Sequence, residues 1–320
     1  MRYASTVALL AAVAAPGIAR AQVPGNPAVQ AQWFTGSLEA PSPALPKAGT
    51  LAIEPYVIYQ ANTGQYGNNG SHRSAANNVR QMESTTLLKY GITDRLSIAA
   101  LPSFVHAWNG QAHFTGIGDL PAELEYRLND ENNETGFPSV TASMGISFPT
   151  GNYDRLHAPL DGLGSGAWTL KEGLLLQSLF DTAGDHPLRL RLYGAAFEPM
   201  ANVAVNDKSV YGTEQGFVGH AAPGLAANFG LGAGYALDRR WVLAFDVVQN
   251  FAHGSRLMGI DAAGNFMNAK AAGDSRTAVA PAIEYNLSGH LGIIAGVEFS
   301  VAGRNISSYI APQIALSVSK

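Results

Sequence analysis

The sequence contains no cysteine, which excludes disulfides and thiolate catalysis. The residues that could do chemistry are therefore carboxylates, basic side chains and histidines. Asp154, His157 and Asp161 are spaced closely enough to bind a hard cation, although a solvated loop is the simpler interpretation. The run Gly162–Gly166 lacks the strand-then-helix context of a phosphate or dinucleotide loop. Neither a Gly-x-Ser-x-Gly elbow nor a His-Glu-x-x-His motif occurs. These patterns predict no catalytic residue, no cofactor and no metal.

A larger set of charged residues stands at alternate positions of runs whose other positions are apolar. If the apolar parity faces lipid, the opposite parity lines the lumen of a barrel. Both signs of charge are present, so the side chains could pair across a narrow, filled interior or form a charged constriction that sets permeation. The lumen-lining candidates are Glu54, Glu83, Lys89, Glu123, Glu125, Arg127, Lys171, Arg189, Arg191, Asp246, Arg276, Glu284 and Glu298.

The elements that must position these residues are β-strands. The clearest alternation covers residues 139–148, where Val140, Met144 and Phe148 share one parity and small or polar residues share the other. The pattern recurs in runs at 51–63, 79–90, 96–105, 116–128, 166–181, 187–203, 215–235, 241–253, 274–286, 291–301 and 310–319. This makes about twelve strands, an even number typical of bacterial outer-membrane barrels.

The connections between the runs alternate in length. Compact turns stand at 91–95, 129–138, 183–186, 237–240 and 287–289. The other connections are mostly longer, at 64–78, 106–115, 150–165, 204–214, 254–273 and, shortest, 303–307. Aromatic residues gather near both sets, as two belts at membrane interfaces would require. The sequence predicts an all-β fold: a transmembrane antiparallel up-and-down barrel with short periplasmic turns and longer extracellular loops.

Composition supports this class. Charged residues make up 14% of the chain, against roughly 25% in soluble domains. The net charge of -4 offers no footprint for nucleic acid. The N-terminus has Arg2, an apolar run from Ala4 to Ala15 and a small-residue site ending at Ala21, which is the layout of a secretory signal peptide.

The segment before the first strand is rich in proline, which excludes a regular helix or a central strand. It could enter the lumen as a plug, line the periplasmic mouth or remain a disordered tail, and Trp33 and Phe34 favour some burial. The expected organisation is therefore a signal peptide at 1–21, a Pro-rich periplasmic or plug segment at 22–50, and a barrel at 51–320.

Several stretches together resemble a known family. "GIGDLPAELEYRL", "PSVTASMGISFPTGNYD" and "LGSGAWTLKEGLLLQSLF" are the most specific, and "FTGSLEAPSPALPKAGTLAIEPY", "GITDRLSIAALPSF" and "GVEFSVAGRNISSYIAPQIALS" extend the match over about 33–320. They are similar to the outer-membrane barrel family named for the meta-cleavage pathway of phenol degradation, whose members are described as transporters. The resemblance implies a bacterial outer-membrane channel or uptake role, with a link to aromatic catabolism.

The leading functional hypothesis is a passive outer-membrane channel for small solutes, with aromatic or other hydrophobic compounds as candidates. Its expected partners are outer-membrane lipid, the solute and the barrel-insertion machinery. A closed structural or adhesive barrel is the first alternative. A barrel-embedded lipid hydrolase is the second, and it would need a serine nucleophile beside a histidine base, for which no motif stands in the sequence. The chain is expected not to be an enzyme.

Overall fold

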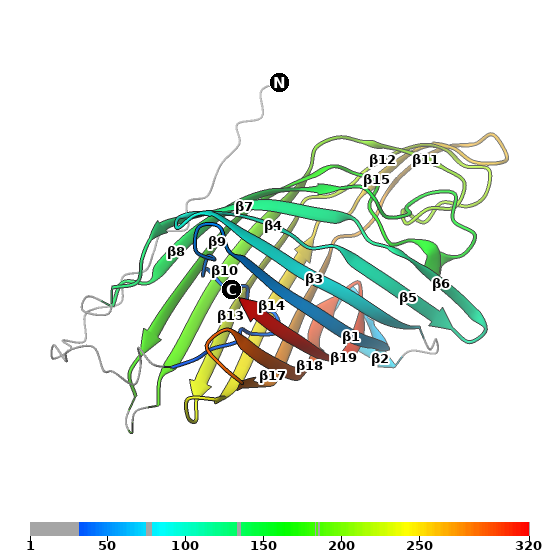
Figure 1. Cartoon of the computed structure of the whole chain (residues 1–320). Helices are drawn as coiled ribbons and strands as arrows, with labels where there is room; N and C mark the ends of the chain where they lie inside the picture. The colour runs from blue at the N-terminus through cyan, green and yellow to red at the C-terminus, as the bar shows by residue number, and fades with distance from the viewer. Residues whose placement is uncertain (1–31, 75–78, 133–135, 183, 185, 320) are drawn as a thin grey trace.

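The computed structural model describes residues 32–74, 79–132, 136–182, 184 and 186–319. Their strands close into one antiparallel barrel (Figure 1). Closure is made by β1 (Leu51–Tyr66), which pairs with β3 (Arg80–Thr93) on one side and with β19 (Ile306–Ser319) on the other. The predicted signal peptide at 1–21 lies outside the described residues. No helix among the described residues has the length and hydropathy needed to cross a membrane.

The barrel wall has twelve strands, as predicted. Six are uninterrupted strands: β1, β3, β8 (Ser139–Phe148), β9 (Thr169–Phe180), β18 (Leu291–Arg304) and β19. Six are interrupted once and are made of the pairs β4 (Leu96–Ala100) and β5 (Ser103–Asn109), β6 (Ala112–Ile117) and β7 (Leu120–Asn129), β10 (Leu188–Pro199) and β11 (Val203–Asn206), β12 (Val218–Ala222) and β13 (Ala226–Ala236), β14 (Trp241–Ala252) and β15 (Arg256–Ile260), and β16 (Phe266–Lys270) and β17 (Asp274–Asn286). The short β2 (His72–Ser74) pairs with the end of β1.

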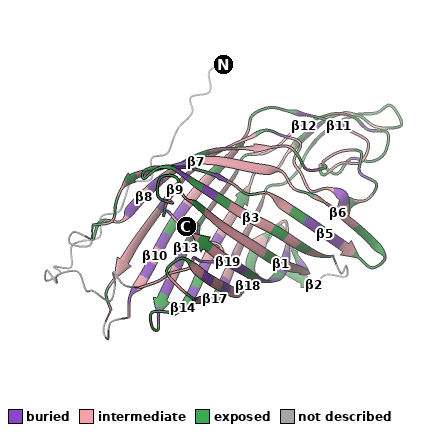
Figure 2. Ribbon diagram, viewed as in Figure 1, coloured by how far each residue is buried: buried purple, intermediate pink, exposed green. Residues whose placement is uncertain are grey.

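Burial alternates along the strands with a period of two (Figure 2). On β14, Leu243 and Phe245 are 47% and 46% exposed, whereas Ala244 between them is 5% exposed and Asp246 is fully buried. A strand of a closed barrel shows one side chain to the lumen and the next to the outside. The outer surface is therefore the apolar one, and the inward parity carries the small and charged residues.

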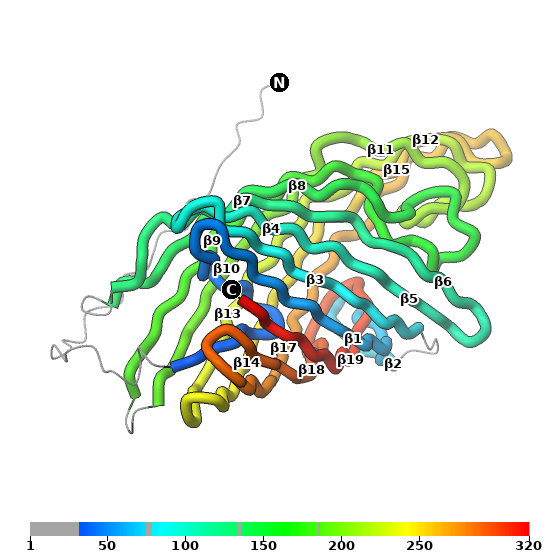
Figure 3. Tube along the Cα trace, viewed as in Figure 1, coloured from blue at the N-terminus to red at the C-terminus, as the bar shows by residue number. Residues whose placement is uncertain are grey.

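Three connections differ from the expectation. The predicted loop at 64–78 contains β2, which pairs with the end of β1. Residues 106–115 and 254–273 were predicted to be loops, but the structure continues the strands into hairpins (Figure 3). The β5–β6 hairpin turns at Gly110, whose φ of 61° suits glycine. The β15–β16 hairpin turns over 261–265 and joins β11 and β12 in a separate four-stranded sheet.

The four-stranded sheet is stable beyond the barrel because its inner face is covered. Val203, Val205, Ala221 and Leu257 pack there with Phe217, which comes from the loop between β11 and β12. This cluster supplies the burial that a projecting sheet would otherwise lack. The sequence did not predict this sheet: residues 254–273 were expected to be a loop, and the loop residues that cover the sheet have no regular pattern.

Candidate functional site

The structure places all thirteen predicted lumen residues on the inward parity of their strands. Three ion pairs join members of the set: Lys89–Glu125 at 2.8 Å, Lys171–Glu123 at 2.6 Å and Arg189–Glu284 at 2.7 Å. The remaining seven have other neighbours. Arg191 donates a hydrogen bond to Gln177, and Arg127 forms an ion pair with Asp130. Three carboxylates accept hydrogen bonds: Glu54 from Ser317, Glu298 from Tyr309, and Asp246 from the Glu39 amide. Arg276 lies over the Tyr309 ring, and Glu83 lines a cavity at the barrel end.

The described part of the N-terminal segment, residues 32–50, runs among these lumen charges. Lumen cations donate to its backbone carbonyls: Arg191 Nη1 to Ala40 O at 3.1 Å, Arg127 Nη2 to Pro43 O at 3.0 Å, and Arg189 Nη2 to Gly36 O. Lys89 Nζ lies 3.4 Å from Ser42 O. Among the described residues, these carbonyls accept no hydrogen bond from the backbone of a neighbouring strand. The charged donors supply that hydrogen bond instead, and hydrogen bonds from charged donors are strong.

Lumen carboxylates bind the amides of the same segment. Glu284 Oε2 accepts from Thr35 N at 2.9 Å, and Asp246 Oδ2 accepts from Glu39 N at 2.9 Å. Carboxylates accept and cations donate, so both signs of charge are needed to bind one extended backbone. The lumen therefore recognises this segment mainly through its main chain.

Uncharged lumen residues add contacts that the sequence reasoning missed. Thr141 donates to Pro43 O at 2.8 Å, Asn286 Oδ1 accepts from Thr35 Oγ1 at 2.8 Å, and Gln313 donates to Glu39 Oε1 at 2.7 Å. Polar residues on the inward parity are common to all barrels with a wet interior. Nothing in the sequence distinguishes these three from other inward polar residues.

Both ends of the segment are fixed at the turn end of the barrel. Gln32 Nε2 donates to Asp238 O at 3.0 Å, and the Arg239 guanidinium lies 4.1 Å from the centre of the Trp33 ring. At the other end Gly49 N donates to Gly91 O at 2.8 Å, just before β1 begins. Residues 32–50 thus enter and leave the barrel at the same end and bend within it.

One close approach makes the position of the segment testable. A Cβ placed on Gly292 of β18 would lie 3.0 Å from the Thr35 Cβ, slightly closer than the roughly 3.5–4.5 Å of a disulfide. We expect the double variant Thr35→Cys, Gly292→Cys to form this bond after a small shift of the segment. The chain has no other cysteine, so one crosslink is unambiguous on a non-reducing gel after trypsin digestion. Thr35→Cys with Gly173→Cys should not crosslink, because the atoms nearest a Cβ on Gly173, an inward glycine of β9, belong to Ser143, Gly194 and Ala195.

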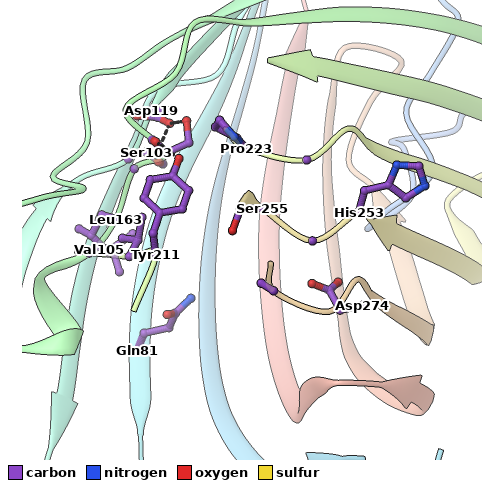
Figure 4. A pocket seen from close by; sticks show the side chains of 18 of the residues that line it. Gln81, Ser103, Val105, Asp119, Leu163, Tyr211, Pro223, His253, Ser255 and Asp274 are labelled. Carbon is purple, nitrogen blue, oxygen red and sulfur yellow. Dashed lines mark hydrogen bonds between the residues drawn. The ribbon is translucent and has the colours of Figure 1, made fainter. Parts of the chain in front are cut away.

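The opposite end of the barrel holds a cavity of about 690 Å³ (Figure 4). Asp119 and Tyr211 stand on one side of it, and His253 and Asp274 stand on the other. Asp119 accepts from Gly151 N at 3.0 Å and from Ser165 N and Oγ at 2.8 Å, so it ties the 149–168 loop to the wall. Burial, helped by the Asp119 charge, raises the pKa of Tyr211 to about 12, so the Tyr211 hydroxyl stays protonated and donates to Ser165 O.

The Asp119 contacts predict a local change in loop stability. Asp119→Ala removes three hydrogen bonds to a carboxylate, each worth about 1.5–3 kcal/mol when the donors are left unpaired. We expect trypsin to cleave after Arg155, which is exposed in this loop, at least about tenfold faster than in the parent chain, since the loss of one such bond already corresponds to a factor of ten. Asp261→Ala is the matched control, because Asp261 organises a different turn through Asn265. Equal cleavage after Arg155 in all three proteins would contradict the assigned role of Asp119.

The cation site considered at Asp154, His157 and Asp161 does not assemble. Asp161 Oδ2 accepts from the backbone amides of His157 and Ala158 at 3.0 and 3.1 Å, and Asp154 Oδ2 faces Asn206. No group of three or more His, Asp or Glu residues in the described ranges is arranged to hold a metal ion. Asp161 is better described as a cap of its own short turn at Pro159–Asp161.

Comparison with known proteins places the fold. No protein-family model matches the chain. No curated protein matches it either. Among solved structures, the COG4313 outer membrane channel from Pseudomonas putida F1 aligns with a TM-score of 0.64 at 16% identity, over 89% of this chain and 100% of that one.

Two further structures align more weakly. The transport unit of the autotransporter AIDA-I from Escherichia coli gives a TM-score of 0.49 at 12% identity, over 85% of this chain and 90% of that one. The TodX monoaromatic hydrocarbon channel gives 0.43 at 10% identity, over 88% and 93%. The alignment with a TM-score of 0.64 and the closed twelve-stranded sheet together give this chain the fold of outer-membrane β-barrels.

Proposed function

We propose that the protein is an outer-membrane channel for small solutes whose lumen is closed by its own N-terminal segment. The observation that carries the proposal is the set of hydrogen bonds that Arg189 and Arg191 donate to backbone carbonyls, and Glu284 and Asp246 accept from backbone amides, of residues 35–40. A barrel that served only as a scaffold could fill its interior with paired or apolar side chains. A segment that is bound by its backbone, and whose two ends both lie at the turn end of the barrel, can be displaced without unfolding the wall.

The lumen residues then have one role in the closed channel and another in the open channel. In the closed form, cations and carboxylates bind the segment. In an open form the same residues line the path, and their mixed signs favour small solutes of low net charge over large ions. Aromatic and other hydrophobic compounds are the solutes that the family resemblance favours, and the fold places no restriction on them.

A barrel-embedded hydrolase has one geometric point in its favour. His72 Nε2 lies 2.8 Å from Ser308 Oγ, which is hydrogen-bond distance for a nucleophile and its base. Ser308 is only 2% exposed, however, and its hydroxyl also lies 3.0 Å from Thr63 Oγ1. A substrate carbonyl has no approach to that oxygen, so the channel proposal is preferred.

The test is the current across a planar bilayer that contains either a chain of residues 22–320 or a chain of residues 47–320. Current that depends on removal of the segment supports a closed channel. Silence in both proteins, when both are folded, favours the closed structural or adhesive barrel. Lipase activity of the pure, folded protein that is lost in Ser308→Ala would favour the hydrolase instead.

A further inference from the structure

The outer face of the four-stranded sheet carries an unbalanced pair of positive charges. Arg256 of β15 and Lys270 of β16 are directly opposite each other in the ladder, and both are exposed. Like charges in direct cross-strand register destabilise a sheet. Within the described residues neither side chain has a hydrogen bond or an ion pair. The arrangement is unfavourable as it stands and would be relieved by an anion.

The rest of that face offers no internal anion. Its outward side chains are Ala204 and Asn206 of β11, Val218, His220 and Ala222 of β12, Arg256, Met258 and Ile260 of β15, and Phe266, Asn268 and Lys270 of β16. None is a carboxylate. The acidic residue at the tip of the hairpin, Asp261, accepts hydrogen bonds from Ala263 and Asn265 within its own turn.

The position of the pair indicates what kind of anion it could meet. Arg256 follows Phe251 by five residues along the wall, a distance of at most about 17 Å at ~3.3 Å per residue. Phe251 and Phe229 form an outward aromatic pair with ring centres 5.8 Å apart, and they are 44% and 50% exposed. Outward aromatic rings mark the edge of the apolar band of a barrel. The charges therefore lie just beyond that edge, at the level of lipid headgroups.

The cross-strand rows between the two basic residues and the hairpin tip carry side chains that can contact a sugar. His220, Met258 and Asn268 form the next cross-strand row, and Val218, Ile260 and Phe266 form the row at the tip. Phe266 is 69% exposed and Val218 is 62% exposed. Exposure of such an apolar strip to water is unfavourable, which indicates a surface that contacts another molecule. An exposed aromatic ring can stack on the apolar face of a sugar, and an amide can bind its hydroxyl groups.

We propose that this face binds the phosphorylated sugar headgroup of an outer-leaflet glycolipid, with Arg256 and Lys270 on the phosphate. The guanidinium of Arg256 can bind phosphate oxygens in bidentate fashion, and the Lys270 ammonium adds a point charge. The lipid acyl chains then lie along the apolar wall near Phe229 and Phe251. The bound lipid holds the projecting sheet beside the mouth cavity.

The test uses the full-length protein in detergent, titrated with bisphosphorylated lipid A and followed by native mass spectrometry. We expect Arg256→Gln, Lys270→Gln to weaken binding roughly thirtyfold, since each of the two basic residues contributes on the order of 1 kcal/mol near a lipid phosphate and ~1.4 kcal/mol is a factor of ten. The matched control is Arg73→Gln, Arg80→Gln, which removes two exposed charges that face Gln65 and Ala61 rather than another base. This control should weaken binding by about twofold or less.

Three outcomes would overturn the proposal. Equal weakening in the two double variants would mean that only overall charge matters. Equal binding of lipid A stripped of its phosphates would remove the phosphate contact. Full competition by inorganic phosphate would make this a site for free phosphate rather than for lipid. A heat-dependent shift on a gel confirms beforehand that each variant is a folded barrel.

Discussion

A chain of residues 47–320 should conduct ions steadily where a chain of residues 22–320 is almost silent. Deletion removes the main chain that Arg189, Arg191, Arg127 and Glu284 bind, and leaves the pairing of Gly49 with Gly91 at the start of β1. We expect the current through single molecules to rise by at least about tenfold, because every ~1.4 kcal/mol removed from the barrier to permeation multiplies the rate by about ten. The measurement is single-channel conductance of refolded protein in a planar bilayer.

The matched control is a chain that lacks only residues 22–31. It begins with Gln32 and so retains all the segment contacts described above, including the stacking of Trp33 on Arg239. It should stay as silent as the chain of residues 22–320. Conductance of the same size in all three proteins would mean that residues 32–46 do not obstruct the path. Loss of the residual conductance of the full chain on oxidation of Thr35→Cys, Gly292→Cys would show by an independent route that the segment does obstruct the path.

Much of the wall could be predicted from the sequence, because a strand with one lipid face and one lumen face has a strict period of two. Residues such as Met144 and Asp246 could be assigned to opposite faces from parity alone, and the structure places them so. The length of the projecting hairpins could not be predicted from the sequence. Residues 256–260 leave the barrel, and their inner face is covered by loop residues such as Phe217 that have no periodicity.

The partners of the lumen charges were also beyond the sequence. Arg191 and Asp246 could each be assigned to the lumen, but their bonds to Ala40 and Glu39 join residues more than 150 positions apart. These bonds go to backbone atoms, which are the same in every residue. A segment that is recognised through its main chain has no side-chain signature, so the Pro-rich composition could predict only that it would not form regular structure.

The buried ion pair between Arg189 and Glu284 should have the largest effect of any single lumen contact on stability. The two side chains are 3% and 0% exposed, and their N–O distance is 2.7 Å. Glu284→Ala leaves the guanidinium buried without its counter-charge, which typically costs about 3–5 kcal/mol. We expect a loss of roughly 3 kcal/mol in the free energy of unfolding, measured by urea titration in lipid vesicles.

The same substitution should also open the channel part of the time, because Glu284 Oε2 is the acceptor for Thr35 N. The control is Glu123→Ala, which breaks the Lys171–Glu123 pair at a similar distance of 2.6 Å but with side chains 28% and 18% exposed. No hydrogen bond joins that pair to the described part of the N-terminal segment. We expect it to cost about 1 kcal/mol or less and to leave the channel closed.

The double variant Arg189→Met, Glu284→Met separates the two roles of the pair. Replacing both buried charges with apolar side chains of similar size is often neutral or stabilising, so we expect the free energy of unfolding to return to within about 1 kcal/mol of the parent. Closure should not return with it, because Gly36 O and Thr35 N still lack their partners. A stable double variant that is as silent as the parent would show that this pair holds the wall together but does not hold the segment.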